Sequence, residues 1–240
     1  MIARKVALPI VISAVATLLA GVALAADPAW KVEWKGRSSD VLAKSDIGAN
    51  VPLLPLTREK HIYALGPIAG FKGEVTIWDS KPLLGQVQDG RPVLRHDADA
   101  AAIWLVWSHI ERWKQVPLTE PMTPARLDEL VRGAARDLGA AADAAIPFRI
   151  KGKLTRADLT ITNYQHDGRP MTAEKLAHIS EHFAVQDLDV DILGFWSAGH
   201  KGIFMPAAGN LHMHANTADA GYHIQDMLLA SGATLFLPVE

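Results

Sequence analysis

Short runs of β-forming residues, separated by glycine, proline and turn-forming pairs, occupy most of the chain after residue 60. The run at 75–78, Val-Thr-Ile-Trp, predicts a strand, since β-branched and aromatic residues suit a pleated, half-buried surface. Asp-Ser at 79–80 and Asp-Gly at 89–90 mark turns on either side of a returning apolar run. Residues 61–95 are therefore expected to form a β-meander.

Two segments have helical rather than β periodicity. Thr123 is a typical N-cap residue and Pro124 suits the first helical position. Apolar residues then recur at helical spacing as far as Leu138. Thr172 is predicted to cap a second helix. The apolar face of that helix would consist of Leu176, Ile179 and Phe183.

Further strands are expected between and after these helices, so the order along the chain is strands, helix, strands, helix, strands. This order predicts an α+β fold (mixed α/β), built from mixed β-sheets with a few flanking helices. The additional strand candidates are 101–107, 148–162, 191–195, 202–205, 211–215 and 234–237.

The composition excludes several classes of protein. Hydrophobic residues make up 49% of the chain and the formal net charge is −2. Such a chain is neither disordered nor basic enough to bind nucleic acid through its phosphates. It contains no cysteine, which excludes disulfide scaffolds, iron–sulfur clusters and thiol catalysis. Any metal site must therefore use carboxylates and some of the ten histidines.

Residues 1–25 have the pattern of a secretory signal peptide. Basic residues near the start precede an uncharged apolar stretch that ends in Ala-Leu-Ala at 23–25. An uncleaved membrane anchor is the alternative, because about 20 apolar residues can span a bilayer. With cleavage, we expect a periplasmic or secreted protein with no membrane contact. It would have an irregular segment at 26–60 and one domain over 61–240.

Three histidines near the C-terminal end form the strongest candidate metal site. His212 and His214 are two residues apart, so on a strand they point to the same side, roughly 6.5–7 Å apart. His223 follows a short loop and can return on a neighbouring strand as a third ligand. Three neutral ligands with an open fourth position are typical of catalytic zinc. The alternative is a pair of surface histidines and an unrelated third.

A competing site lies at 178–182, His-Ile-Ser-Glu-His, which fits the H-x-x-E-H pattern of inverted zincin proteases. On a helix, His178 and His182 would lie one turn apart and share a metal, with Glu181 as the base. The alternative places both histidines on the polar face of the second helix. Because no carboxylate ligand is evident on another helix, a metalloprotease is the weaker interpretation.

Two blocks of sequence point to one family when they are taken together. The first, 62–90, is a glycine-punctuated run that enters a strand through Phe-Lys-Gly-Glu-Val at 71–75. The second contains Gly-Asn-Leu-His-Met-His at 209–214 and Gly-Tyr-His at 221–223, with Phe-Arg-Ile-Lys-Gly at 148–152 as a weaker anchor. In order and spacing, these blocks resemble the α-acetolactate decarboxylases, a zinc-dependent family that converts 2-acetolactate to acetoin and carbon dioxide.

The resemblance implies a two-sheet architecture, a metal site and a catalytic carboxylate. It matches His212, His214 and His223 with the family's zinc ligands, and Glu74 with a carboxylate near the metal. In the family the metal acts as a Lewis acid toward substrate oxygens, and glutamates manage the proton. The expected cofactor is therefore Zn²⁺ or another divalent metal. The expected substrate is a small hydroxy-keto acid, with Glu74 as acid/base.

One departure from the family bears on substrate binding. The family places an arginine eleven residues beyond the counterpart of Arg149, and this position holds Thr160 here. Arg149 and Arg156 remain as candidates to bind a substrate carboxylate, although both also suit an exposed surface. The alternative function is an exported homologue that binds a metal or ligand and has lost decarboxylase activity. The strand-rich N-terminal half also suits a homodimer.

Overall fold

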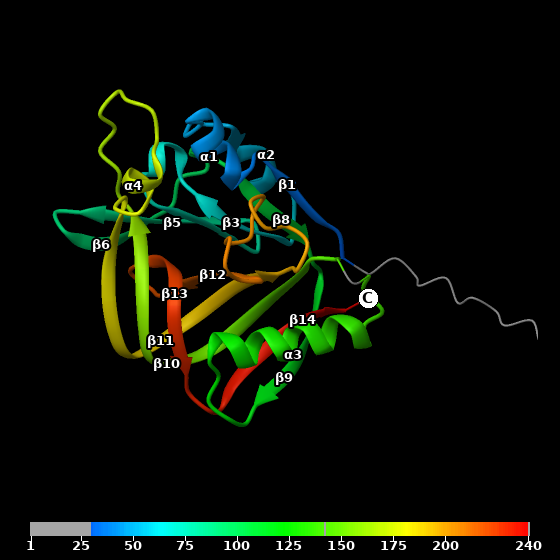
Figure 1. Cartoon of the computed structure of the whole chain (residues 1–240). Coiled ribbons are helices and arrows are strands. Elements are labelled where there is room, and N and C mark those ends of the chain that lie inside the picture. The colour runs from blue at the N-terminus through cyan, green and yellow to red at the C-terminus, as the bar shows by residue number, and fades with distance from the viewer. Residues whose placement is uncertain (1–29, 142, 240) are drawn as a thin grey trace, which may run out of the picture.

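Two antiparallel sheets of six strands each pack against one another and hold the molecule together (Figure 1). The structure is a computed structural model, which describes residues 30–141 and 143–239. The predicted α+β class is confirmed, since strands dominate and only one described helix exceeds two turns. Every pairing between named strands is antiparallel.

The first sheet contains the predicted meander. Consecutive strands β3 to β6 pair with their neighbours across residues 61–95, and two further strands extend the sheet beyond β3. In spatial order, the sheet consists of β1 (Val32–Lys35), β8 (Leu105–His109), β3 (Ile62–Pro67), β4 (Glu74–Trp78), β5 (Lys81–Gln88) and β6 (Arg91–Arg95).

The second sheet is strongly curved because four of its strands close into a ring. The first strand of this sheet, β11 (Ser180–Trp196), pairs both with the second strand, β12, and with the fourth strand, β10, and this closes the ring. In spatial order, the sheet consists of β11 (Ser180–Trp196), β12 (Leu211–Asn216), β13 (Gly221–Leu229), β10 (Ile146–Thr162), β14 (Ala233–Val239) and β9 (Arg112–Leu118).

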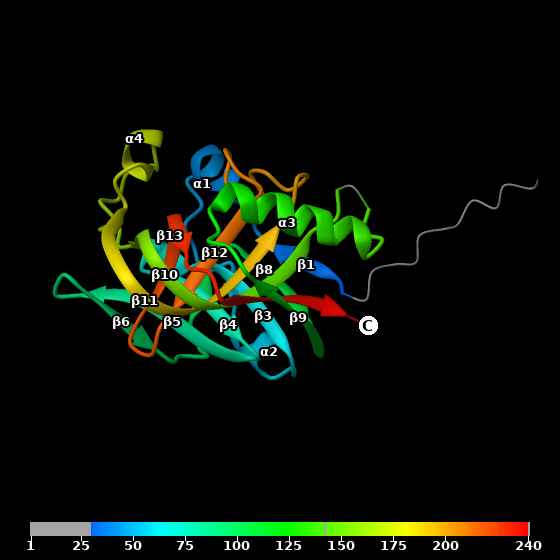
Figure 2. The same ribbon diagram turned by 90° about the horizontal axis from the view of Figure 1, so that it is seen from below.

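The longest helix, α3 (Pro124–Asp137), begins where the sequence predicts. The Thr123 side chain accepts a hydrogen bond from a backbone N–H of the first turn, as an N-cap residue does. The buried face of α3 consists of Leu127, Val131 and Ala135, and it packs on the second sheet (Figure 2). The remaining elements are α1 (Ser38–Lys44), α2 (Leu54–Thr57), α4 (Ala173–Leu176), the 3₁₀ turn η1 (Ala69–Phe71) and the strand pair β2 (Val51–Pro52) and β7 (Ala101–Ala102).

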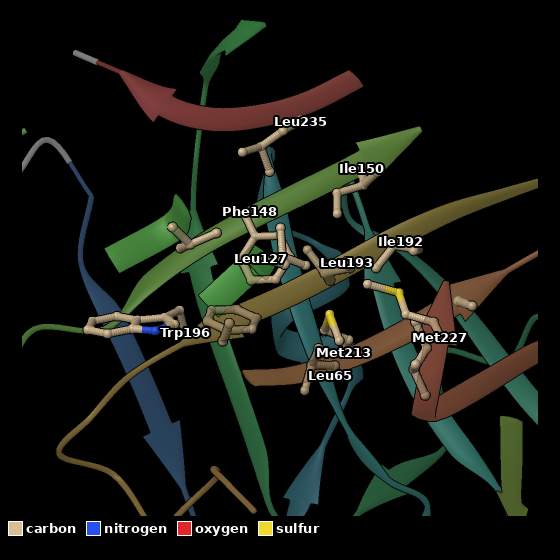
Figure 3. Close-up of a cluster of buried hydrophobic side chains, with 14 of the residues drawn as sticks. Leu65, Leu127, Phe148, Ile150, Ile192, Leu193, Trp196, Met213, Met227 and Leu235 are labelled. Carbon is tan, nitrogen blue, oxygen red and sulfur yellow. The ribbon is translucent and has the colours of Figure 1, made fainter. Parts of the chain in front are cut away.

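A single cluster of buried side chains joins the two sheets (Figure 3). It contains Leu65 from the first sheet and Phe148 from the second. Met213 of β12 belongs to the same cluster. Since successive side chains on a strand alternate between faces, the neighbours His212 and His214 are turned away from this core. The register of β12 therefore decides both which side chain packs in the core and which way the histidines point.

The prediction of the second helix is wrong over most of its length. The helix α4 follows Thr172, as expected, but contains only four residues, and Phe183 lies in β11. There β11 pairs with β10 along nearly its whole length, with Phe183 opposite Leu159. This long hairpin satisfies the backbone hydrogen-bonding groups of the segment, and that tertiary pairing outweighs a weak helical periodicity.

Three smaller expectations also change. The run 101–107 is divided between β7 and β8 rather than forming one strand. Residues 202–205 form a turn, with only an isolated bridge between Lys201 and Met205. The segment 26–60 was expected to be irregular, but its described part contributes two strands and two short helices.

None of the described helices is long and apolar enough to cross a membrane. The predicted signal peptide, residues 1–25, lies outside the described residues. Its cleavage and the export of the chain remain predictions.

The backbones of the two sheets touch at Gly85 of β5 and Gly221 of β13. A Cβ atom added to Gly85 would lie only 1.8 Å from the Gly221 carbonyl oxygen. We predict that Gly85→Ala lowers the free energy of unfolding by about 3 kcal/mol, because the sheets must separate to admit the methyl group. Urea denaturation measures this change.

Gly133→Ala provides the matched control, because a Cβ atom added at that position of α3 meets nothing within 4 Å. This variant should be neutral or stabilised by up to about 1 kcal/mol, since alanine favours a helix over glycine. Equal unfolding free energies for the two variants would contradict a close contact between the sheets.

Candidate metal centre and adjoining cavity

His212, His214 and His223 come together on two neighbouring strands. A tight turn at 217–220 connects these strands, closed by the Thr217 N–H, which donates to the Ala220 carbonyl oxygen at 2.8 Å. This turn sets a register in which His214 lies directly opposite His223. His212 and His214 are buried, whereas His223 is partly exposed to a cavity. The structure thus brings together the three residues that the sequence selected.

The spacing of the three rings fits one tetrahedral ion. The ring centre of His212 lies 5.2 Å from that of His214 and 5.2 Å from that of His223, and the last two are 5.7 Å apart. Zn–N bonds of about 2.1 Å in tetrahedral geometry hold imidazole ring centres roughly 5 Å apart. Within the described ranges, no group of three or more His, Cys, Asp or Glu side chains is arranged to hold a metal ion as it stands. The ring centres have the spacing of a tetrahedral site, and the side chains would have to adjust to bind an ion.

Two ring nitrogens in this cluster are buried without any hydrogen-bond partner. They are Nδ1 of His212 and Nε2 of His214. The other nitrogen of His214, Nδ1, lies 3.2 Å from Oγ1 of Thr76. Buried polar atoms are almost always satisfied, and metal-binding imidazoles are typically oriented by a hydrogen bond at their second nitrogen. The unpartnered atoms and the Thr76 contact are what a metal ligand set requires.

Burial keeps these imidazoles neutral, which is the form that binds metal. It lowers the pKa of His212 and His214 well below the ordinary value, and the neighbouring histidines lower both further. Burial also lowers the pKa of His223, to about 4. All three side chains are therefore unprotonated at neutral pH, and no proton has to be displaced when a cation binds.

Glu74 is the buried acid beside the histidines. One oxygen, Oε1, accepts a hydrogen bond from the Thr162 backbone N–H at 2.9 Å. The other, Oε2, lies 3.7 Å from Nε2 of His214. Only 4% of Glu74 is exposed. Burial raises its pKa to about 8, against hydrogen bonds from Thr162 that lower it. Such a carboxyl group can take up or release a proton near neutral pH.

A cavity of about 540 Å³ opens in front of this cluster. Glu74, His212 and His223 line its inner end. Thr160 and Gln225 lie beside them, with Nε2 of Gln225 donating to Oγ1 of Thr160 at 3.2 Å and lying 3.3 Å from Nδ1 of His223. None of the described lining residues is a lysine or an arginine. The cavity therefore combines a polar inner end with no basic partner for an anion.

The structure does not bring Arg149 or Arg156 to this cavity. Arg156 lies on the surface, paired with Asp226 at 3.0 Å. The guanidinium of Arg149 is surrounded by aromatic rings and donates to the Tyr63 hydroxyl at 3.0 Å. Thr160, at the position of the family arginine, does line the cavity and lies opposite His223. The rings within 4.7–5.4 Å of the Arg149 guanidinium carbon belong to Tyr63, Trp78, Trp113 and Phe236.

The competing protease site is not formed. His178 follows α4, where its Nδ1 lies 2.8 Å from the Glu174 carbonyl oxygen, whereas His182 lies in β11 near Asp158. Glu181 accepts a hydrogen bond from the Asn163 side chain at 2.5 Å. Because these histidines are not on one helix, they do not share a face one turn apart, and the zincin interpretation is wrong.

Four residues of the site were missed by sequence reasoning. Thr76 and Thr162 contact His214 and Glu74, and Trp104 and Gln225 line the cavity. Thr162 and Trp104 reach the site through contacts between segments distant in sequence, and no local motif marks them. Thr76 and Gln225 lie two residues after Glu74 and His223 on the same strands, so strand alternation was a signal that could have found them. Threonine is common in strands because β-branched side chains suit a pleated surface, so its presence in a strand does not by itself indicate a functional site.

Comparisons with known proteins agree on the fold. No protein-family model matches the sequence, and no curated protein gives a significant match. The α-acetolactate decarboxylase from Bacillus subtilis strain 168 is similar in structure with a TM-score of 0.68 at 13% identity, over 87% of this chain and 86% of that chain. A Staphylococcus aureus protein of unknown function, described as similar to α-acetolactate decarboxylase, has a TM-score of 0.66 at 12% identity, over the same shares. The resemblance seen in the sequence is thus confirmed as a shared fold.

The surroundings of Arg149 predict that it stabilises the fold. We expect Arg149→Ala to lower the free energy of unfolding by about 2 kcal/mol, because cation–π contacts and packing of its aliphatic stem are lost. The matched control is Arg156→Ala, whose exposed ion pair is worth at most about 1 kcal/mol. Denaturant unfolding of both variants checks the difference. If Arg149→Ala is as stable as Arg156→Ala, the aromatic surroundings contribute nothing.

Proposed function

We propose that the chain is a metal-dependent lyase of the α-acetolactate decarboxylase type, which releases CO₂ from a small 2-hydroxy-3-keto acid such as 2-acetolactate. One observation carries the proposal. Three imidazoles at tetrahedral spacing, two of them buried and the third partly exposed to the cavity, lie beside the buried carboxyl of Glu74 at its inner end. The shared fold with α-acetolactate decarboxylases supports the same reaction class.

His212, His214 and His223 would hold the metal, Zn²⁺ or another divalent ion. When bound, the metal supplies Lewis-acid polarisation of a substrate oxygen. Thr76 orients His214 from the first sheet, through the contact at Nδ1. The ligand set thus depends on both sheets, although all three ligands come from the second.

Glu74 would manage the single proton of the reaction. The bond between the carboxylate carbon and the hydroxyl-bearing carbon breaks, CO₂ leaves, and the bonding electrons pass into the adjacent carbonyl as an enediolate. One proton added at carbon then yields the neutral hydroxyketone, acetoin in the case of 2-acetolactate. The oxygen Oε2 of Glu74 is free to deliver it, because Thr162 holds Oε1.

The absence of a basic residue from the described cavity lining is compatible with decarboxylation. A guanidinium would bind the carboxylate of the substrate more strongly than a transition state in which that charge moves toward the carbonyl. Interactions that favour the ground state do not accelerate the chemical step. Thr160 in place of the family arginine should therefore weaken substrate binding more than it slows bond cleavage.

A second function is favoured by the same observation. Because no lysine or arginine of the described lining can orient a substrate carboxylate, the site would serve to bind a metal or a neutral ligand, with no turnover. In either case we propose that the chain acts outside the cytoplasm on a small molecule, since residues 1–25 have the signal-peptide pattern.

Metal binding is tested by the zinc content of purified variants after dialysis. We expect about one equivalent in the wild type and almost none in His212→Ala, because two remaining imidazoles bind zinc poorly. His178→Ala is the control and should keep its zinc, since His178 lies outside the cluster. A wild type that retains no divalent metal would contradict both the lyase and the metal-binding function.

Turnover is tested by acetoin production from racemic 2-acetolactate with metal-loaded protein. We predict that Glu74→Gln lowers kcat about 100-fold or more while zinc content is kept, because the amide has no proton to deliver. An active Glu74→Gln enzyme would remove Glu74 from the reaction. If the metal-loaded wild type makes no acetoin, the binding function replaces the lyase.

A further inference from the structure

An aromatic wall of the cavity begins at the histidines. The ring centre of Trp104 lies 5.2 Å from that of His212. Phe204 is buried, and its ring stacks on that of His200 with a centre-to-centre distance of 4.7 Å. Both Trp104 and Phe204 line the cavity. An apolar group bound here would meet a fixed surface directly beside the reacting atoms.

The helix α1 continues this apolar surface toward the mouth of the cavity. The N–H groups of Ser38 and Ser39 donate to the carbonyl oxygens of Ile203 and Gly202, both at 2.9 Å, and so fix the helix to the loop that follows His200. Leu42 lines the cavity from this helix, and it is 46% exposed. A large apolar side chain thus faces solvent at a hollow site, where a ligand could cover it.

The cavity is larger than a small acid requires, and its described lining contains no basic side chain. A volume of about 540 Å³ is in the range of clefts that hold drug-sized ligands, roughly 300–1,000 Å³. Glu74 is the acidic side chain at the inner end, and the described lining offers no lysine or arginine to a second acidic group. The space beyond the reacting atoms is therefore suited to an uncharged, apolar part of a ligand.

We propose that the cavity selects substrates that carry an extended alkyl substituent, and that Leu42 and Trp104 determine this selectivity. The inference rests on the proposed function for the reaction itself. The substrate class is then 2-hydroxy-2-alkyl-3-oxo acids with an alkyl chain long enough to pass Trp104 and reach Leu42. The reaction is unchanged: CO₂ leaves, one proton is taken up, and a long-chain hydroxyketone is the product.

The first test compares 2-hydroxy-2-alkyl-3-oxobutanoates from methyl to hexyl with the metal-loaded full chain. We expect kcat/KM to rise about fourfold per added methylene while the chain remains within the cavity, from the burial of apolar area. Leu42→Ser should lower the hexyl-to-methyl ratio of kcat/KM about tenfold. The matched control is Leu138→Ser, which alters a leucine of 36% exposure at the end of α3 and should leave the ratio unchanged.

The second test measures binding without turnover. Calorimetry with the metal-loaded protein compares 3-hydroxy-2-butanone with 3-hydroxy-2-nonanone, and the longer ketone should bind more tightly to the wild type and to Leu138→Ser than to Leu42→Ser. If no acid is decarboxylated but this pattern holds, the proposed function fails and the ligand class stands. If the methyl and hexyl acids of the first test are both decarboxylated, and chain length changes neither kcat/KM nor the affinity for the ketones, the proposed ligand class is overturned.

Discussion

The carboxyl group of Glu74 is buried between the two sheets, and the hydrogen bond to its Oε1 helps to fix how the sheets meet. A carboxyl group without partners would be costly at this depth. Here the Thr162 N–H donates to Oε1, and the Thr162 hydroxyl donates to the Gly73 carbonyl oxygen at 2.8 Å. The start of β4 is thereby joined to the end of β10. The same contact turns Oε2 toward His214.

Two backbone features allow this approach of the sheets. Glycine at 85 and 221 lets the strands β5 and β13 touch beside the site, where any side chain on Gly85 would collide with the opposite carbonyl. Alternation along β12 then separates the roles of adjacent residues, since Met213 packs in the shared core and the histidines on either side face the first sheet. Core stability and the geometry of the histidines are therefore coupled through one strand.

Sequence reasoning could identify the histidines and Glu74 because their signals are local: a two-residue alternation, a short turn and a strand start within a family-like block. It could not find Thr162 or Trp104, because they reach the site through contacts between distant segments. The helix expected through Phe183 failed for a related reason, since the pairing of β10 with β11 decides the structure there. Arg149 was misplaced because its aromatic neighbours come from β3, β4, β9 and β14.

The metal centre at the junction of the sheets is tested most directly by X-ray absorption at the zinc edge, on full-length protein loaded with one equivalent of zinc. The ring spacing predicts a shell of three imidazole nitrogens at about 2.0–2.1 Å and one oxygen donor. Loss of one imidazole in His223→Ala would confirm that the third ligand comes from β13. A spectrum without imidazole scattering, or with the same shell in His223→Ala, would contradict the assignment.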